Sequence, residues 1–133
     1  MLSLGMDIGT STVKLVLLKN QEIEKQWMAV HHGNPFVCLK KGLSTLELAM
    51  DTLFSLCVTG SNTEALLEQD SAIPSLGDIP AIVEGVRWII PQVGSVIEIG
   101  SQGARFITDL QSRAPQFAVN EHCAGGTGSF FED

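Results

Sequence analysis

Two short segments of this chain combine a carboxylate, a glycine and several hydroxyl or amide side chains, and each segment lies between two apolar runs. A turn of small residues lets backbone N–H groups and hydroxyls approach phosphate oxygens, because no bulky side chain blocks the way. A carboxylate beside such a turn can hold Mg²⁺ through the water molecules of the ion. The pattern predicts a polyphosphate site made by Asp7, Gly9, Thr10, Ser11, Thr12 and Lys14 in the first segment, and by Gly100, Ser101 and Gln102 in the second, where Glu98 and Arg105 match Asp7 and Lys14.

The second segment repeats the first, residue by residue. Acid aligns with acid at Asp7 and Glu98, glycine aligns with glycine, and a base follows at Lys14 and Arg105. One such turn alone is a weak signal, but a duplication with aligned chemistry favours two loops that face one polyphosphate in a shared groove. The two bases either steer phosphates or lie in solvent as charged strand ends.

Alternation of apolar and polar residues predicts the elements that must position these turns. We expect a three-stranded meander over residues 2–8, 13–19 and 22–30, with the second strand in the middle of a sheet. Helical spacing follows over 35–50, then a strand over 53–59 and one or two helical turns over 61–69. An amphipathic helix over 78–90, with Ile82, Val83 and Val86 buried, leads to a second meander over 96–99, 104–108 and 116–119.

Bulk properties narrow the class of protein. The 133 residues are 44% apolar and carry a net charge of −7, which argues against a nucleic-acid partner. No apolar run reaches about 18 residues, so we expect no membrane span. No secretory leader precedes the first strand, and we expect a cytoplasmic protein. We also expect Cys38 and Cys57 to be free buried thiols, and the pair His31 and His32 to be a solvated strand end.

Cys123 has different surroundings, because it opens the glycine-rich run Cys-Ala-Gly-Gly-Thr-Gly at residues 123–128. The run reads as a loop that leads into a helix. Free N–H groups at a helix start stabilise a thiolate or the sulfur of an iron–sulfur cluster. The alternative is a plain thiol in a glycine-rich turn.

These motifs carry a resemblance to a known group of proteins. Residues 7–14 resemble the first phosphate loop of the actin, sugar-kinase and Hsp70 ATPase superfamily, and residues 98–103 resemble its second. The run over 120–128 is similar to the activator ATPases of 2-hydroxyacyl-CoA dehydratases, a group that includes the benzoyl-CoA reductase ATPase subunits. The resemblance implies an α/β, ribonuclease H-like (actin-like ATPase) fold, with one complete domain over residues 1–92 and the opening strands of a second over 93–133.

The resemblance also implies a function. It is that of an ATP-driven electron donor to a 2-hydroxyacyl-CoA dehydratase-type enzyme, in which a homodimer shares one [4Fe-4S] cluster. Cys123 would ligate the cluster, Asp7 would hold Mg²⁺ at the ATP or ADP phosphates, and the turn residues named above would face those phosphates. The second cluster cysteine and the adenosine motif are expected beyond residue 133, so we expect this stretch to be inactive alone.

The second loop departs from the family pattern. It has Glu98, Ser101 and Gly103 where the family reads Asp-Ile-Gly-Gly-Gln-Asp, so the carboxylate after Gln102 is missing. One alternative is therefore a non-catalytic interaction or regulatory domain that keeps the fold without turnover. Another is a small-molecule kinase of the same superfamily, which the run at Cys123 disfavours.

Overall fold

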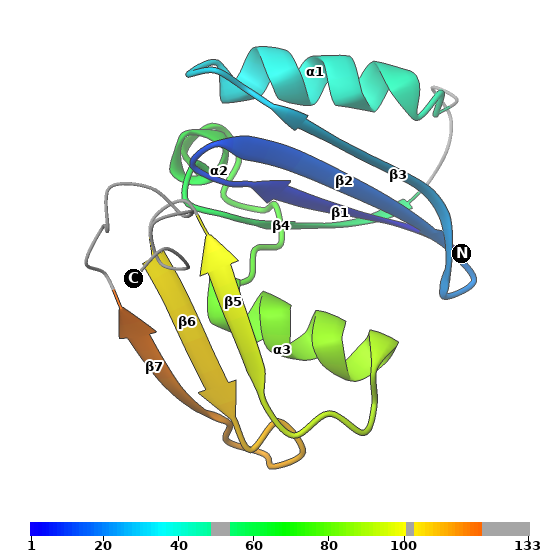
Figure 1. Cartoon of the computed structure of the whole chain (residues 1–133). Coiled ribbons are helices and arrows are strands. Elements are labelled where there is room, and N and C mark those ends of the chain that lie inside the picture. Colours follow the sequence, from blue (N-terminus) through cyan, green and yellow to red (C-terminus); the bar gives the residue numbers. More distant parts are fainter. Residues whose placement is uncertain (49–53, 101–102, 121–133) are drawn as a thin grey trace. The chain divides into compact units, whose positions relative to one another are not determined.

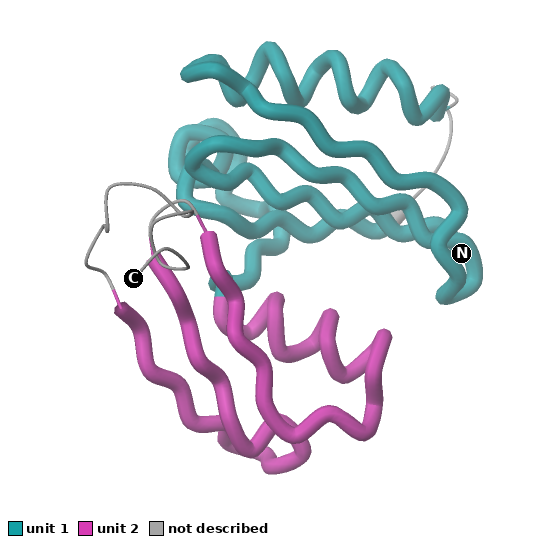
Figure 2. Tube along the Cα trace, in the orientation of Figure 1, with its two compact units in different colours: residues 1–78 teal, residues 79–133 magenta. Residues whose placement is uncertain are grey.

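A computed structural model describes residues 1–48, 54–100 and 103–120. The chain divides into two compact units, Met1–Asp78 and Ile79–Asp133, shown in teal and magenta in Figure 2. Within the described ranges, no helix combines the length and apolar character needed to cross a membrane.

The first unit is built on a four-stranded sheet. Its strands are β1 (Leu2–Ile8), β2 (Thr12–Lys19), β3 (Glu22–Val30) and β4 (Phe54–Thr59), in the order β3-β2-β1-β4 (Figure 1). The three consecutive strands pair antiparallel, whereas β4 lies parallel to β1. The predicted meander is confirmed, and β2 lies in the interior of the sheet as its two-sided apolar character indicated.

Helix α1 (Pro35–Thr45) covers one face of this sheet (Figure 1). Gly42 lets the helix approach closely, because a Cβ there would lie only 2.5 Å from the ring of Trp27 and 2.7 Å from Leu15. The helix is shorter than the predicted span of 35–50, since Glu47 already has a φ of +53°. The core between helix and sheet consists of Leu4, Met6, Ile8, Val13, Leu15, Leu17, Leu39, Leu46 and Val58.

The opposite face of the sheet carries small polar residues on β1 and β4. Ser55 donates a hydrogen bond to the Ser3 hydroxyl over 2.8 Å, two register positions from the pair formed by Gly5 and Cys57. Cys57 is exposed on this face, so the expectation that it is buried was wrong, and Cys38 in α1 is half-buried. Strand periodicity explains the error, because Cys57 alternates with the buried Val58.

The short helix α2 (Glu64–Gln69) follows β4 in the first unit, and α3 (Asp78–Ile89) begins where that unit ends. The second unit contains a three-stranded antiparallel sheet, β5 (Val96–Gly100), β6 (Gly103–Thr108) and β7 (Gln116–Asn120), in the order β5-β6-β7. The predicted helix and second meander are both confirmed.

Helix α3 and the second sheet share one core. Val83 is buried with Ile107 and Leu110, while Ile82 and Val86 pack against them half-buried, so only part of the predicted burial is seen. The Arg87 guanidinium ties the helix to the loop after β6, where it donates to the Leu110 carbonyl over 2.6 Å. Compactness thus groups most of α3 with the second sheet, whereas the expected boundary between two ATPase domains at residues 92/93 stays a prediction.

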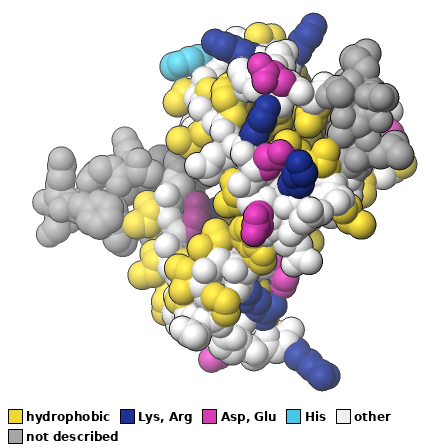
Figure 3. Space-filling model, turned by 90° about the vertical axis from the view of Figure 1, so that its right-hand side faces the viewer, with side chains coloured by type: hydrophobic (Ala, Val, Ile, Leu, Met, Phe, Trp, Pro, Cys, Tyr) yellow, Lys and Arg dark blue, Asp and Glu magenta, His cyan; other side chains and the backbone are white. Residues whose placement is uncertain are grey.

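The surface of the chain mixes charge types. On the face shown in Figure 3, acidic and basic side chains are interspersed with hydrophobic ones. The ion pairs of the first unit include Lys19 with Glu24 at 3.5 Å and Lys25 with Glu47 at 3.5 Å, and each of these side chains is at least 37% exposed. Exposed pairs of this kind contribute little to stability, so each unit is stabilised mainly by its own apolar core.

Candidate functional site

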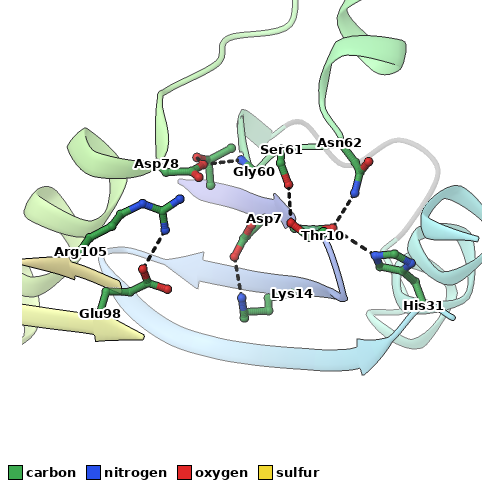
Figure 4. Close-up of polar contacts among 12 residues, drawn as sticks. Asp7, Thr10, Lys14, His31, Gly60, Ser61, Asn62, Asp78, Glu98 and Arg105 are labelled. Carbon is green, nitrogen blue, oxygen red and sulfur yellow. Dashed lines mark hydrogen bonds and ion pairs between the residues drawn. The ribbon is translucent and has the colours of Figure 1, made fainter. Parts of the chain in front are cut away.

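The first predicted phosphate turn joins β1 to β2. Its ends are closed by a hydrogen bond from the Gly9 N–H to the Thr12 carbonyl, 3.0 Å long. Asp7 and Lys14 face each other across the two strands, and the lysine donates to the carboxylate over 2.7 Å (Figure 4). Both side chains are partly exposed, at 32% for Asp7 and 47% for Lys14. The hairpin therefore places a carboxylate, a cation and a turn of small residues together, as predicted.

The Gly9 carbonyl accepts two side-chain hydrogen bonds from distant parts of the first unit. The Asn62 amide donates over 2.7 Å, and His31 Nε2 lies 3.1 Å from the same oxygen (Figure 4). The Gly33 N–H donates to His31 Nδ1 over 3.1 Å, so Nδ1 is an acceptor and the proton of the neutral ring lies on Nε2. His31 is thus a donor to the turn.

Two further carbonyls beside the turn also accept hydrogen bonds. The His31 N–H donates to the Ser11 carbonyl over 3.0 Å, and the Asn62 N–H donates to the Ile8 carbonyl over 2.9 Å. By contrast, the N–H groups of Thr10 and Ser11 donate to no acceptor in the described part of the chain. The Thr10 and Ser61 hydroxyls lie 3.0 Å apart at the exposed side of the turn. The turn therefore presents N–H and O–H groups outward, which suits an anionic ligand.

Gly60 lies directly behind the turn, at the end of β4. Its φ of +104° is one that residues with a side chain rarely adopt, and a Cβ there would lie 2.5 Å from the Ile8 carbonyl and 2.7 Å from Asp7 Oδ1. Its N–H donates to Asp78 over 3.2 Å, and the Thr59 hydroxyl donates to the same carboxylate oxygen over 3.3 Å. Glycine is required here because any side chain would displace the β1 backbone and the carboxylate.

Sequence reasoning missed His31, Asn62 and Gly60 as parts of this site. His31 is only 8% exposed, so its interpretation as a solvated strand end was wrong. The alternation of β3, in which Trp27 and Ala29 turn inward, would have found it if the strand pattern had been continued past Val30. Nothing local pointed to Asn62, because its contact with Gly9 spans 53 residues of sequence.

The second predicted turn repeats the charge arrangement of the first. Glu98 and Arg105 pair across β5 and β6, and the guanidinium donates to the carboxylate over 2.7 Å. Gly100 pairs with Gly103, whose φ is +137°. Ser101, Gln102 and Cys123 lie outside the described residues, so their roles, and a groove shared by the two turns, stay predictions. In the described ranges, no three His, Cys, Asp or Glu side chains gather as a metal site.

Solved structures similar to this chain define its fold. An activator of 2-hydroxyisocaproyl-CoA dehydratase from Clostridium difficile with bound ADPNP matches with a TM-score of 0.78 at 26% identity, over 100% of this chain and 53% of that chain. Component A of the (R)-2-hydroxyglutaryl-CoA dehydratase from Acidaminococcus fermentans matches with a TM-score of 0.76 at 25% identity, over 99% of this chain and 52% of that chain. The ethanolamine utilization protein EutJ from Carboxydothermus hydrogenoformans matches with a TM-score of 0.61 at 17% identity, over 92% of this chain and 53% of that chain. The chain therefore has the predicted α/β, ribonuclease H-like fold of actin-like ATPases.

Sequence comparison gives a more specific relationship. The chain is 31% identical to the 2-hydroxyisocaproyl-CoA dehydratase activator of Clostridioides difficile, over 99% of this chain and 50% of the relative. It is 28% identical to the activator of lactoyl-CoA dehydratase of Anaerotignum propionicum, over 99% of this chain and 52% of the relative. No protein-family model matches it. The chain spans about half the length of the curated relatives it matches. The resemblance to 2-hydroxyacyl-CoA dehydratase activators that its motifs indicated is confirmed.

Proposed function

We propose that this chain is the N-terminal portion of an ATP-dependent activator of a 2-hydroxyacyl-CoA dehydratase-type enzyme. The observation that carries the proposal is its similarity, over essentially its whole length, to activators that include one solved with bound ADPNP. The first turn supports a nucleotide role independently, because two of its N–H groups have no acceptor among the described residues and lie beside a carboxylate that is 32% exposed.

In this proposal the first turn binds the phosphates of ATP or ADP. The N–H groups of Thr10 and Ser11 donate to phosphate oxygens, together with the hydroxyls of the turn. Asp7 fits an outer-sphere role toward Mg²⁺, because its carboxylate is partly exposed and lies next to the turn. Lys14, which donates to Asp7 over 2.7 Å, steers the phosphates. The full set of phosphate-facing residues that we propose is Gly9, Thr10, Ser11, Thr12, Lys14, Gly100, Ser101 and Gln102.

We further propose that Cys123 contributes one ligand to a [4Fe-4S] cluster shared across a homodimer in the cytoplasm. A thiolate before a glycine-rich run has the chemistry that such a cluster requires. A two-fold contact lets each subunit supply half of the ligands. The bound cluster would supply a low-potential electron to the dehydratase partner, and ATP binding and hydrolysis would drive its transfer.

Calorimetric titration of the purified protein with magnesium ADP tests the nucleotide part. We expect binding to the wild-type protein and at least about tenfold weaker binding to Asp7→Asn, because that variant removes the charge beside Mg²⁺. Glu24→Gln is a matched control, since Glu24 lies on β3 and pairs only weakly with Lys19 at 3.5 Å. Equal affinity of Asp7→Asn and wild type would contradict the role of Asp7.

Anaerobic purification tests the cluster part. We expect a brown protein that absorbs at about 400 nm, as is typical of iron–sulfur clusters. Cys123→Ser should lose its iron while its affinity for magnesium ADP stays unchanged, and Cys57→Ser should keep its iron. A colourless wild-type protein that still binds ADP would instead favour the non-catalytic domain or the small-molecule kinase.

A further inference from the structure

We infer that His31 and Asn62 are positioning residues that hold the first turn in its phosphate-binding shape. They do so by fixing the Gly9 carbonyl, which accepts from Asn62 Nδ2 over 2.7 Å and from His31 Nε2 over 3.1 Å. The inference rests on the proposed nucleotide role of the turn, and it assigns a function to two residues from outside the hairpin.

The hydrogen bonds around the turn divide into two groups. Carbonyl oxygens of Ile8, Gly9, Ser11 and Thr12 all accept from the protein, whereas the N–H groups of Thr10 and Ser11 donate to none of the described residues. An anion is attracted by free N–H groups and repelled by free carbonyl oxygens. Keeping these four carbonyls occupied therefore favours the binding of an anion by the turn.

His31 and Asn62 each contribute a backbone and a side-chain donor to this arrangement. His31 donates its N–H to Ser11 and its ring proton to Gly9, and Asn62 donates its N–H to Ile8 and its amide to Gly9. The Gly33 N–H fixes the ring of His31 from the other side, over 3.1 Å. Since His31 is a buried residue, 8% exposed, few other orientations are available to its ring.

The Gly9–Thr10 peptide is the unit that these two donors keep in place. Glycine can adopt backbone angles that other residues avoid, so the peptide could rotate and point its oxygen toward the ligand. Two donors on one oxygen oppose that rotation. When one of them is lost, the other still satisfies the carbonyl. We therefore expect the effects of losing them to be coupled rather than independent.

The experiment is a double-mutant cycle, with magnesium pyrophosphate as a probe of the phosphate turn alone. His31→Leu and Asn62→Ala should each weaken pyrophosphate binding about threefold to tenfold, and the double variant should lose more than the product of the two losses. His31→Gln keeps an N–H donor on a flexible side chain and should recover affinity to within about threefold of wild type. His32→Asn is the matched control, because His32 is exposed and its positive φ of 47° suits asparagine.

Two readouts separate positioning from a general loss of folding. Thermal unfolding shows whether each variant is folded at the titration temperature, and the amide resonances of Thr10 and Ser11 should shift in the variants but not in His32→Asn. If Asn62→Ala does not fold, the comparison of His31→Leu with His31→Gln still decides the matter. Unchanged pyrophosphate affinity in folded His31→Leu and Asn62→Ala would overturn the inference. A wild-type protein that binds neither pyrophosphate nor ADP would overturn the proposed function, and the inference with it.

Discussion

The two hairpins of this chain share their charges but differ in what supports them. Asp7 with Lys14 and Glu98 with Arg105 occupy the same register positions, and both ion pairs are 2.7 Å long. The third strands share their register too, with Ala29 and Asn120 at equivalent places. Continued along the sequence, the same alignment pairs His31 with His122, which lies outside the described residues.

Among the residues that the structure describes, packing is closer around the first hairpin than around the second. In the first unit α1 packs through a buried glycine, and β4 brings Gly60 against the back of the turn. In the second unit α3 also contains a glycine, Gly85, but no atom of the described residues outside its own helical turn lies within 4 Å of a Cβ placed there. The second sheet also leaves Ile97 and Phe117 more than half exposed. Duplicated hairpins can thus keep identical charge geometry while the packing around them diverges.

The largest effect should come from Gly60→Ala, which tests whether the first turn depends on close packing. The new Cβ would meet the Ile8 carbonyl at 2.5 Å in a backbone region strained for alanine, so we expect a loss of about 2–5 kcal/mol in the free energy of unfolding. Urea denaturation measures it. Gly33→Ala is the control, because Gly33 also has a positive φ but open space around it. The control should lose about 1–2 kcal/mol in the free energy of unfolding. Equal losses in the two variants would mean that backbone strain alone, and not close packing, destabilises Gly60→Ala.

The helices allow a second test of the same contrast, in which one substitution has opposite signs. Gly42→Ala in α1 should lower the free energy of unfolding, because overpacking against Trp27 costs about 1–3 kcal/mol and outweighs a gain in helix propensity of about 1 kcal/mol. Gly85→Ala in α3 meets no neighbour among the described residues and should raise the free energy of unfolding by about 0.5–1 kcal/mol. Thermal unfolding of both variants checks the signs. Stabilisation by Gly42→Ala would show that the Trp27 ring moves aside easily.

Sequence periodicity was enough to predict the strands and α3, because a half-buried sheet or helix imposes a pattern on every residue. The charge pairs could be foreseen from the repeat, since aligned hairpins place aligned residues opposite each other. The contacts that support the first turn could not be foreseen. Asn62 reaches Gly9 across 53 residues of sequence, and the need for glycine at position 60 depends on the atoms that a Cβ there would contact. Such contacts depend on how β4 pairs with β1, which no local pattern encodes.

The smallest effect should come from the charge pairs themselves, which tests whether the shared charges serve stability or ligand binding. Lys14→Met and Arg105→Met each remove one partner of a cross-strand pair. Because all four side chains are about a third to a half exposed, we expect losses below about 1 kcal/mol in the free energy of unfolding, smaller still in 1 M salt. The loss should be the greater for Arg105, whose side chain is 29% exposed and makes a further interaction.

Titration of the same two variants with magnesium pyrophosphate completes this comparison. If Lys14 steers phosphates, Lys14→Met should weaken binding by at least about tenfold although its stability hardly changes, because the removed charge acts on the ligand rather than on the fold. Lys19→Met is the matched control, since Lys19 lies at the far end of β2 and pairs with Glu24 at 3.5 Å. Affinity that follows stability alone in all three variants would mean that Lys14 is only a charged residue beside Asp7.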